Sequence, residues 1–189
     1  MAIYTNLEAV KNGTHGIFES SSMKATISGN IFDILTVDDA DEAIAVDNGV
    51  AVKVGNYTGN GLQERFGTVA KTTDKIAVTG NPAIIKDAFT KSQEAIVNYF
   101  VPAGKLVKTY EVVKNDVFAI GLHQFTDASA TEVKEGAFVV VDGDGAWVAQ
   151  SADPGADTYG FVGQVHSMSY SNVDSLTVVR IVCVQNVQL

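Results

Sequence analysis

Short apolar runs that alternate with tight-turn residues constrain this fold more than any other feature, and they are clearest in residues 104–145. There GKLVKTYEVVKNDVFAI holds two β-prone runs around a Lys-Asn-Asp turn, and AFVVVDGDG holds a third run that ends in an Asp-Gly turn. Runs rich in β-branched and aromatic residues, bounded by Gly, Asn and Asp, are typical of strands. A similar order of features lies in residues 23–55. The sequence therefore predicts two β modules.

The first β module is predicted to cover residues 23–80. KATISGNIFDILTV places a Ser-Gly-Asn turn between two β-prone runs, which predicts a hairpin. Asp47-Asn48-Gly49 separates two further alternating runs, and it predicts a second hairpin because Asn and Gly tolerate positive φ. RFGTVAK and DKIAVTG supply two more strand candidates.

The second β module, residues 104–189, repeats part of this order. Phe32 and Gly49 of the first module correspond to Phe118 and Gly136 of the second at nearly the same separation along the chain. This spacing predicts a duplication or two copies of one strand order, with chance similarity as the alternative. LTVVRIVCVQNV closes the chain as a long apolar strand, which suits burial on both faces.

Residues 1–22 form an unusual N-terminal segment. Its apolar residues begin with helical spacing, but Gly13 and Gly16 stop any helix within three turns, and so short a helix is marginal in water. We therefore expect a mostly extended arm, which either docks on a partner or folds back onto its own module. The candidate partner-docking residues are its large apolar side chains, Ile3, Tyr4, Leu7, Ile17 and Phe18.

Residues 81–103 connect the two modules. An apolar stripe with helical spacing lies between Pro82 and Pro102, and it predicts a short helix at about 82–92 that gives way to a strand from Ala95. The predicted fold class is therefore mainly β, with two small β-barrel or sandwich-like modules in tandem, an extended N-terminal arm and a short, partly helical linker.

Composition and charge narrow the classes of function. Thirteen basic and 22 acidic side chains give a formal net charge of −9. Affinity for a phosphate backbone comes mainly from Lys and Arg, so nucleic acid and anionic membranes are poor partners. No apolar run approaches the roughly 20 residues that cross a bilayer. The start of the chain lacks the basic and apolar regions of a signal peptide, and we expect synthesis in a cytoplasm.

The chain carries few candidates for chemistry. Cys183 is the single cysteine, and its apolar surroundings predict a buried, inert thiol without a disulfide. His15, His123 and His166 lie far apart and without a motif, so we expect surface or hydrogen-bonded structural roles for them. No phosphate-binding, dinucleotide-binding or nucleophile motif occurs. We accordingly predict no catalytic residue, no metal site and no cofactor.

Two acidic stretches and one tryptophan are candidate ligand sites. The acidic run of residues 38–42 and the Asp142-Gly-Asp-Gly145 turn offer carboxylates for Ca²⁺, but a solvated loop and a tight turn explain them more simply. Trp147, with Tyr159 and Phe161 nearby, could stack on a sugar. Core packing is the favoured interpretation for one Trp inside a β segment.

The segments VPAGKLVKTYEVVKNDVFAIG, KEGAFVVVDGDGAWVA, TYGFVGQV and VVRIVCV resemble virion structural proteins of tailed bacteriophages. The chain is most similar to small β proteins that decorate or cement the capsid shell. The resemblance covers about residues 101–184 and rests on the rhythm of glycines and strands.

The resemblance implies a non-enzymatic protein that binds the outer lattice of the major capsid protein in many copies and stabilises it. It implies a place on the capsid surface of the virion after synthesis in the host cytoplasm. A homo-oligomer would add avidity. The alternatives are another head, fibre-base or tail component, and a carbohydrate- or ligand-binding β module that uses Trp147.

Overall fold

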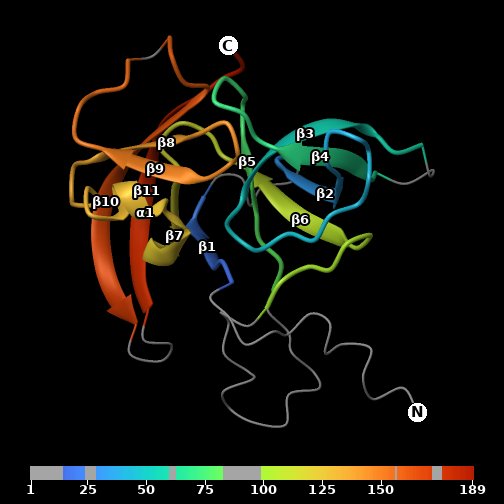
Figure 1. Cartoon of the computed structure of the whole chain (residues 1–189), viewed down its shortest axis with the longest axis horizontal. Helices are drawn as coiled ribbons and strands as arrows, with labels where there is room; N and C mark the ends of the chain where they lie inside the picture. The colour runs from blue at the N-terminus through green and yellow to red at the C-terminus, as the bar shows by residue number, and fades with distance from the viewer. Residues whose placement is uncertain (1–14, 24–28, 60–62, 83–98, 156, 172–175) are drawn as a thin grey trace, which may run out of the picture.

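The computed structural model describes residues 15–23, 29–59, 63–82, 99–155, 157–171 and 176–189. These residues form a closed five-stranded barrel and a separate six-stranded sheet (Figure 1). The prediction of a mainly β protein is confirmed, with a closed barrel and one separate sheet. The predicted helix at about 82–92 and the strand from Ala95 lie largely outside the described residues.

The barrel closes in the strand order β2-β4-β3-β5-β6, with β6 paired back to β2. Its strands β2 and β4 run parallel, and the other pairs are antiparallel. The barrel strands are β2 (Ile31–Thr36), β3 (Ala51–Tyr57), β4 (Arg65–Val69), β5 (Ala77–Thr79) and β6 (Leu106–Glu111). Alternate side chains point inward, because successive residues of a strand face opposite sides. Ile34, Val52 and Val107 are therefore fully buried within it.

The sheet has the order β1-β7-β11-β10-β8-β9, and all of its pairs are antiparallel. Its strands are β1 (Phe18–Ser22), β7 (Val117–Gly121), β8 (Phe138–Val141), β9 (Trp147–Gln150), β10 (Phe161–Ser171) and β11 (Leu176–Asn186). A 3₁₀ turn η4 (Leu122–Gln124) and a short helix α1 (Asp127–Ala130) lie between β7 and β8. The long hairpin of β10 and β11 extends well beyond the rest of the sheet (Figure 1).

The structure assigns two strands differently from the predicted segments. β1, from the end of the predicted arm, pairs with β7 in the sheet, and β6, from the predicted second module, closes the barrel. The barrel is thus inserted between the first and second strands of the sheet. Asn115 (φ 73°) makes the turn after β6, but this turn carries the chain from the barrel to the sheet instead of joining a hairpin. Backbone bonds with Cys183 of β11 hold the turn there.

The two strand orders also differ, so the prediction of two copies of one order is wrong. The barrel contains a parallel pair, whereas the sheet is antiparallel throughout. Gly49 and Gly136 do share a positive φ (77° and 84°) and each precedes a strand. However, the run before Gly49 does not form the predicted hairpin with β3, because Val46 bridges Val101 instead. Similar turns here serve different long-range pairings.

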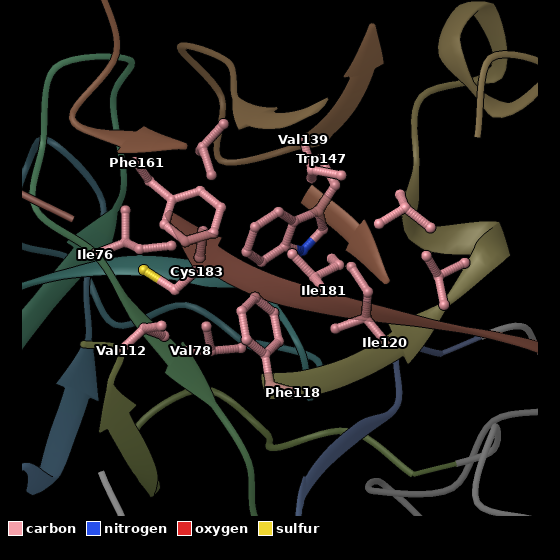
Figure 2. Close-up of a cluster of buried hydrophobic side chains, with 14 of the residues drawn as sticks. Ile76, Val78, Val112, Phe118, Ile120, Val139, Trp147, Phe161, Ile181 and Cys183 are labelled. Carbon is pink, nitrogen blue, oxygen red and sulfur yellow. The ribbon is translucent and has the colours of Figure 1, made fainter. Parts of the chain in front are cut away.

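One hydrophobic core joins the barrel to the sheet. Trp147, Phe118 and Phe161 point toward one another, with ring centroids 5.6–6.2 Å apart (Figure 2). Ile76 and Val78 extend into the same cluster from the barrel side. Burying an aromatic or branched side chain contributes about 1.5–3 kcal/mol. The shared core therefore couples the barrel and the sheet energetically.

Candidate functional site

The candidate docking residues divide between described and undescribed parts of the chain. Ile3, Tyr4 and Leu7 lie outside the described residues. Ile17 is buried against Ala119 and Val178 of the sheet. Phe18 starts β1, and its ring lies 5.3 Å from that of Tyr110 and 6.2 Å from that of Phe118. The structure thus packs Ile17, which is buried, and Phe18, which is half-buried, against this chain's own core, where they anchor the arm.

Polar contacts hold the residues just before this anchor. His15 Nδ1 lies 2.8 Å from Asp47 Oδ1, and its ring stacks on Phe100 at a centroid distance of 4.9 Å. The backbone N–H of Gly16 donates to Asp47 Oδ2 at 3.2 Å. Because Asp47 belongs to the loop before the barrel strand β3, these contacts tie the chain entering the sheet to the barrel.

Gln124, at the end of η4, completes the attachment. Its Oε1 accepts hydrogen bonds from the backbone N–H groups of Ile17 (2.9 Å) and Gly121 (2.7 Å), and its Nε2 donates to the Asn48 carbonyl at 3.0 Å. His123 Nε2 lies 3.0 Å from the His15 carbonyl, which can only accept, so Nε2 carries the proton. We call this group, His15, Gly16, Asp47, His123 and Gln124, the arm-root cluster.

The arm-root cluster depends on close backbone approach. A Cβ atom added to Gly16 would overlap the Asn48 carbonyl oxygen, and one added to Gly49 would overlap the Gln124 amide. The Trp147 indole N–H donates to the Gly49 carbonyl at 2.7 Å. A cavity of about 260 Å³, which includes Asp47, His123 and Trp147 in its lining, lies beside these contacts.

The sugar-stacking hypothesis for Trp147 is wrong, and the favoured interpretation of core packing is confirmed. Trp147 is only 1% exposed, Phe161 is equally buried, and Tyr159 is half-buried. A stacking platform needs an open ring face, which Trp147 lacks. Its indole instead links the sheet to the barrel.

The remaining chemical candidates have structural roles in the described residues. Asp38 Oδ1 accepts from the N–H groups of Ala40 and Glu42, and Asp142 Oδ1 accepts from those of Asp144 and Ala146, so both carboxylates close their own turns. No group of three or more His, Cys, Asp and Glu side chains in the described part of the chain could hold a metal ion.

Cys183 and His166 are two further residues whose side chains could take part in chemistry. Cys183 is fully buried, and removal from water raises the pKa of its thiol to about 12. The prediction of a buried, inert thiol is confirmed. His166 lies exposed on β10.

The terminal strands of the sheet are β1 and β9, and part of β10 forms a further edge. β8 pairs with β10 only from Val162 to Gln164, so the outer half of β10 pairs on one side alone among the described residues. Tyr170 near the end of that half is 61% exposed. β1, at one end of the sheet, pairs with β7. Open edges present unpaired N–H and C=O groups that can accept a strand from a partner.

A second surface feature lies on the barrel, and sequence reasoning did not find it. Arg65 at the start of β4 packs over the rings of Phe32 and Tyr57 beside a hollow. No local pattern indicated this group, because three different strands bring it together.

Comparisons of the chain with protein-family models, with curated proteins and with solved structures found no match. Among the described residues, no helix has the length and apolar character needed to cross a membrane.

Proposed function

We propose that the protein is a non-enzymatic structural component of a bacteriophage virion that binds the outer lattice of the major capsid protein and stabilises it. The observation that carries the proposal is the arm-root cluster together with the shared core. They make a rigid body with an arm attached at a fixed point. A decoration protein needs such a body to resist deformation and an attached segment to reach its neighbours.

The arm divides into two functional parts under this proposal. Ile17 and Phe18 anchor it, because their side chains pack against β7 and the barrel. Ile3, Tyr4 and Leu7 contact the capsid, where a segment that orders on contact gains apolar burial and backbone hydrogen bonds. Many copies on one lattice, or a homo-oligomer, would add avidity to a weak single contact.

The test is co-sedimentation of the purified chain with capsids that lack it. Deleting residues 2–14 removes the proposed contact residues and leaves the arm-root cluster intact. We expect the shortened protein to keep the thermal unfolding midpoint of the full chain and to lose most of its capsid binding. A matched control replaces residues 2–14 by a Gly/Ser segment of equal length, which keeps the length but not the side chains.

Unchanged binding by both variants would reject the arm as the docking element. No binding by the full chain would reject the decoration function. Labelling of the bound protein distinguishes the alternative of another head, fibre-base or tail component, because a decoration protein covers the shell and the others sit at one vertex or on the tail.

A further inference from the structure

The arginine on the barrel surface is held in place by two aromatic rings. The Arg65 guanidinium carbon lies 4.8 Å from the ring centroid of Phe32 and 4.5 Å from that of Tyr57. Its Nη2 donates to the Tyr57 hydroxyl at 3.0 Å. Such contacts restrict a side chain that is otherwise among the most flexible. Arg65 is therefore oriented before any ligand arrives.

The backbone of three strands builds this arrangement. Tyr57 of β3 lies directly opposite Arg65 of β4, after a register shift between Val54 and Tyr57. Such an irregularity re-aims the side chains that follow it. The parallel pairing of β2 with β4 places Arg65 beside Ile34, so Phe32 lies two residues away along β2. Cross-strand pairing therefore fixes the Phe32–Arg65–Tyr57 group.

Among the described residues Arg65 has no acidic partner, whereas three lysines on or next to barrel strands do. Lys53, Lys75 and Lys108 each form an ion pair, with Asp74, Glu111 and Asp33 respectively. Within the described ranges, Arg65 forms none. Most of its in-plane N–H donors are therefore left for another acceptor.

The hollow beside Arg65 is large enough to hold a small ligand. Its volume is about 570 Å³, and Phe32, Asp33, Tyr57, Gln63 and Arg65 contribute to its lining. Ligand pockets typically measure about 300–1,000 Å³ and combine aromatic surface with a few polar groups. Tyr57 is 60% exposed although Arg65 covers one face of its ring, so the other face is open.

We propose that this hollow binds a saccharide that carries a carboxylate. The carboxylate accepts paired hydrogen bonds from the Arg65 guanidinium, whose planar fork matches that geometry. The C–H face of the sugar ring packs on the open face of Tyr57, and the sugar hydroxyls bond to Asp33 and Gln63. This site is independent of the arm and goes beyond the proposed capsid role.

The charge around the hollow favours this class of ligand over two others. The Asp33 side chain is 53% exposed and pairs with Lys108 at 3.2 Å, and the negative charge that it retains repels a doubly charged phosphate more than a singly charged carboxylate. An acidic peptide would supply a carboxylate for Arg65 but few hydroxyl groups for Asp33 and Gln63. Each further acid in such a peptide would also meet a protein of net charge −9.

The test measures binding of the purified full-length chain to four probes by titration. Two probes are tetrasaccharides that carry glucuronate or N-acetylneuraminate, the third is a neutral tetrasaccharide of matched size, and the fourth is a glutamate-rich peptide. We expect at least one acidic saccharide to bind about tenfold or more tightly than the neutral one, as a hydrogen-bonded charge pair should provide. Arg65→Gln should abolish this preference.

Two further variants sharpen the test. Arg180→Gln is the matched control, because Arg180 is the only other arginine in the chain and donates to Ser169 on the sheet. It should bind like the wild type. Tyr57→Ala should weaken binding of the acidic saccharide about three- to tenfold through loss of the stacking face. Each variant's unfolding midpoint is measured alongside, and Arg65→Lys replaces Arg65→Gln if the latter is unstable.

Three results would overturn the proposal. The first is equal binding of acidic and neutral saccharides, or no binding of either. The second is a preference that survives Arg65→Gln and Arg65→Lys. The third is binding of the peptide as tight as that of the saccharides, which would make the hollow a protein-docking surface. None of these results depends on whether the chain binds capsids.

Discussion

The barrel and the sheet of this protein differ in how the edges of their strands are paired. The barrel closes on itself through β6 and β2, so all of its strands pair on both sides. The sheet stays open, with β1 and β9 as its terminal strands and the outer half of β10 paired on one side alone among the described residues. Closure leaves the barrel only its side chains for recognition, whereas the sheet can also offer backbone groups. Their shared core makes this division possible within one rigid body.

The largest expected effect comes from breaking the shared core. Phe118→Ala removes a buried ring that contacts Trp147, Phe161 and Phe18, and it should lower the free energy of unfolding by about 3–5 kcal/mol. Urea unfolding, followed by Trp147 fluorescence and by far-UV circular dichroism, should give one coincident transition in the wild type and the variant. Val184→Ala, at a position 39% exposed, should change the unfolding free energy by about 0.5 kcal/mol or less.

Two separate transitions would contradict the coupling. If the far-UV circular dichroism signal of the strands persists after the change in Trp147 fluorescence, the barrel stays folded when the sheet has unfolded. The comparison between the two parts would then concern two domains and not one body.

An intermediate effect is expected from the contact between the barrel loop and the arm-root cluster. Gly49 and Gly104 both have positive φ, 77° and 75°, so an added side chain is strained at either position. Only at Gly49 would the new Cβ also overlap the Gln124 amide and the Ile17 carbonyl, whereas at Gly104 it meets open space. Gly104→Ala should cost about 1 kcal/mol of unfolding free energy, and Gly49→Ala should cost clearly more. Equal losses would show that the arm-root cluster has room to relax.

A smaller change in the free energy of unfolding is expected at acidic pH. It comes from Asp74, which lies where the end of the sheet meets the barrel. Burial raises the pKa of Asp74, but hydrogen bonds from Lys53, the Lys71 N–H and Gln188 outweigh it, so the folded pKa lies below the ordinary 3.8. A lowered folded pKa stabilises the fold above the unfolded value, and this contribution is lost as the pH falls through the folded value.

Asp74→Asn should therefore destabilise the protein at pH 7 by about 1–3 kcal/mol, the usual worth of hydrogen bonds to a charged group. The difference between wild type and variant should shrink as the pH falls below about 4, where the carboxylate takes up its proton. Urea titrations at several pH values measure it. Asp33→Asn is the control, because its exposed pair with Lys108 should contribute little at any pH. A pH-independent Asp74→Asn difference would refute the assignment.

Much of the fold was predictable because it depends on local chemistry. The turn at Asn115 needed a residue that tolerates positive φ, and Cys183 and Trp147 were predicted to be buried from their apolar surroundings. Their local sequence was sufficient. The destination of each strand was not predictable in the same way. β1 and β6 belong to other parts of the fold than the sequence predicted, because strand pairing depends on residues far away along the chain, such as Ile120 for Phe18.

The candidate sites show the same limit. His15, Asp47 and Gln124 have no shared motif, and only the insertion of the barrel between β1 and β7 brings them together. The hollow beside Arg65 depends on the register shift before Tyr57, and no pattern in the sequence indicates that shift. The local sequence identifies Ile17 and Phe18 as apolar residues of an arm. It does not indicate whether they pack against this chain or against a partner.

A cryo-EM map of capsids saturated with the purified protein would show where the protein binds and which residues touch the shell. We expect the barrel and the sheet as one body on the outer shell, with Ile17 and Phe18 packed against that body and residues 2–14 in contact with the capsid lattice. Density for the body at some other place on the particle, or an arm that touches only its own barrel and sheet, would contradict this expectation.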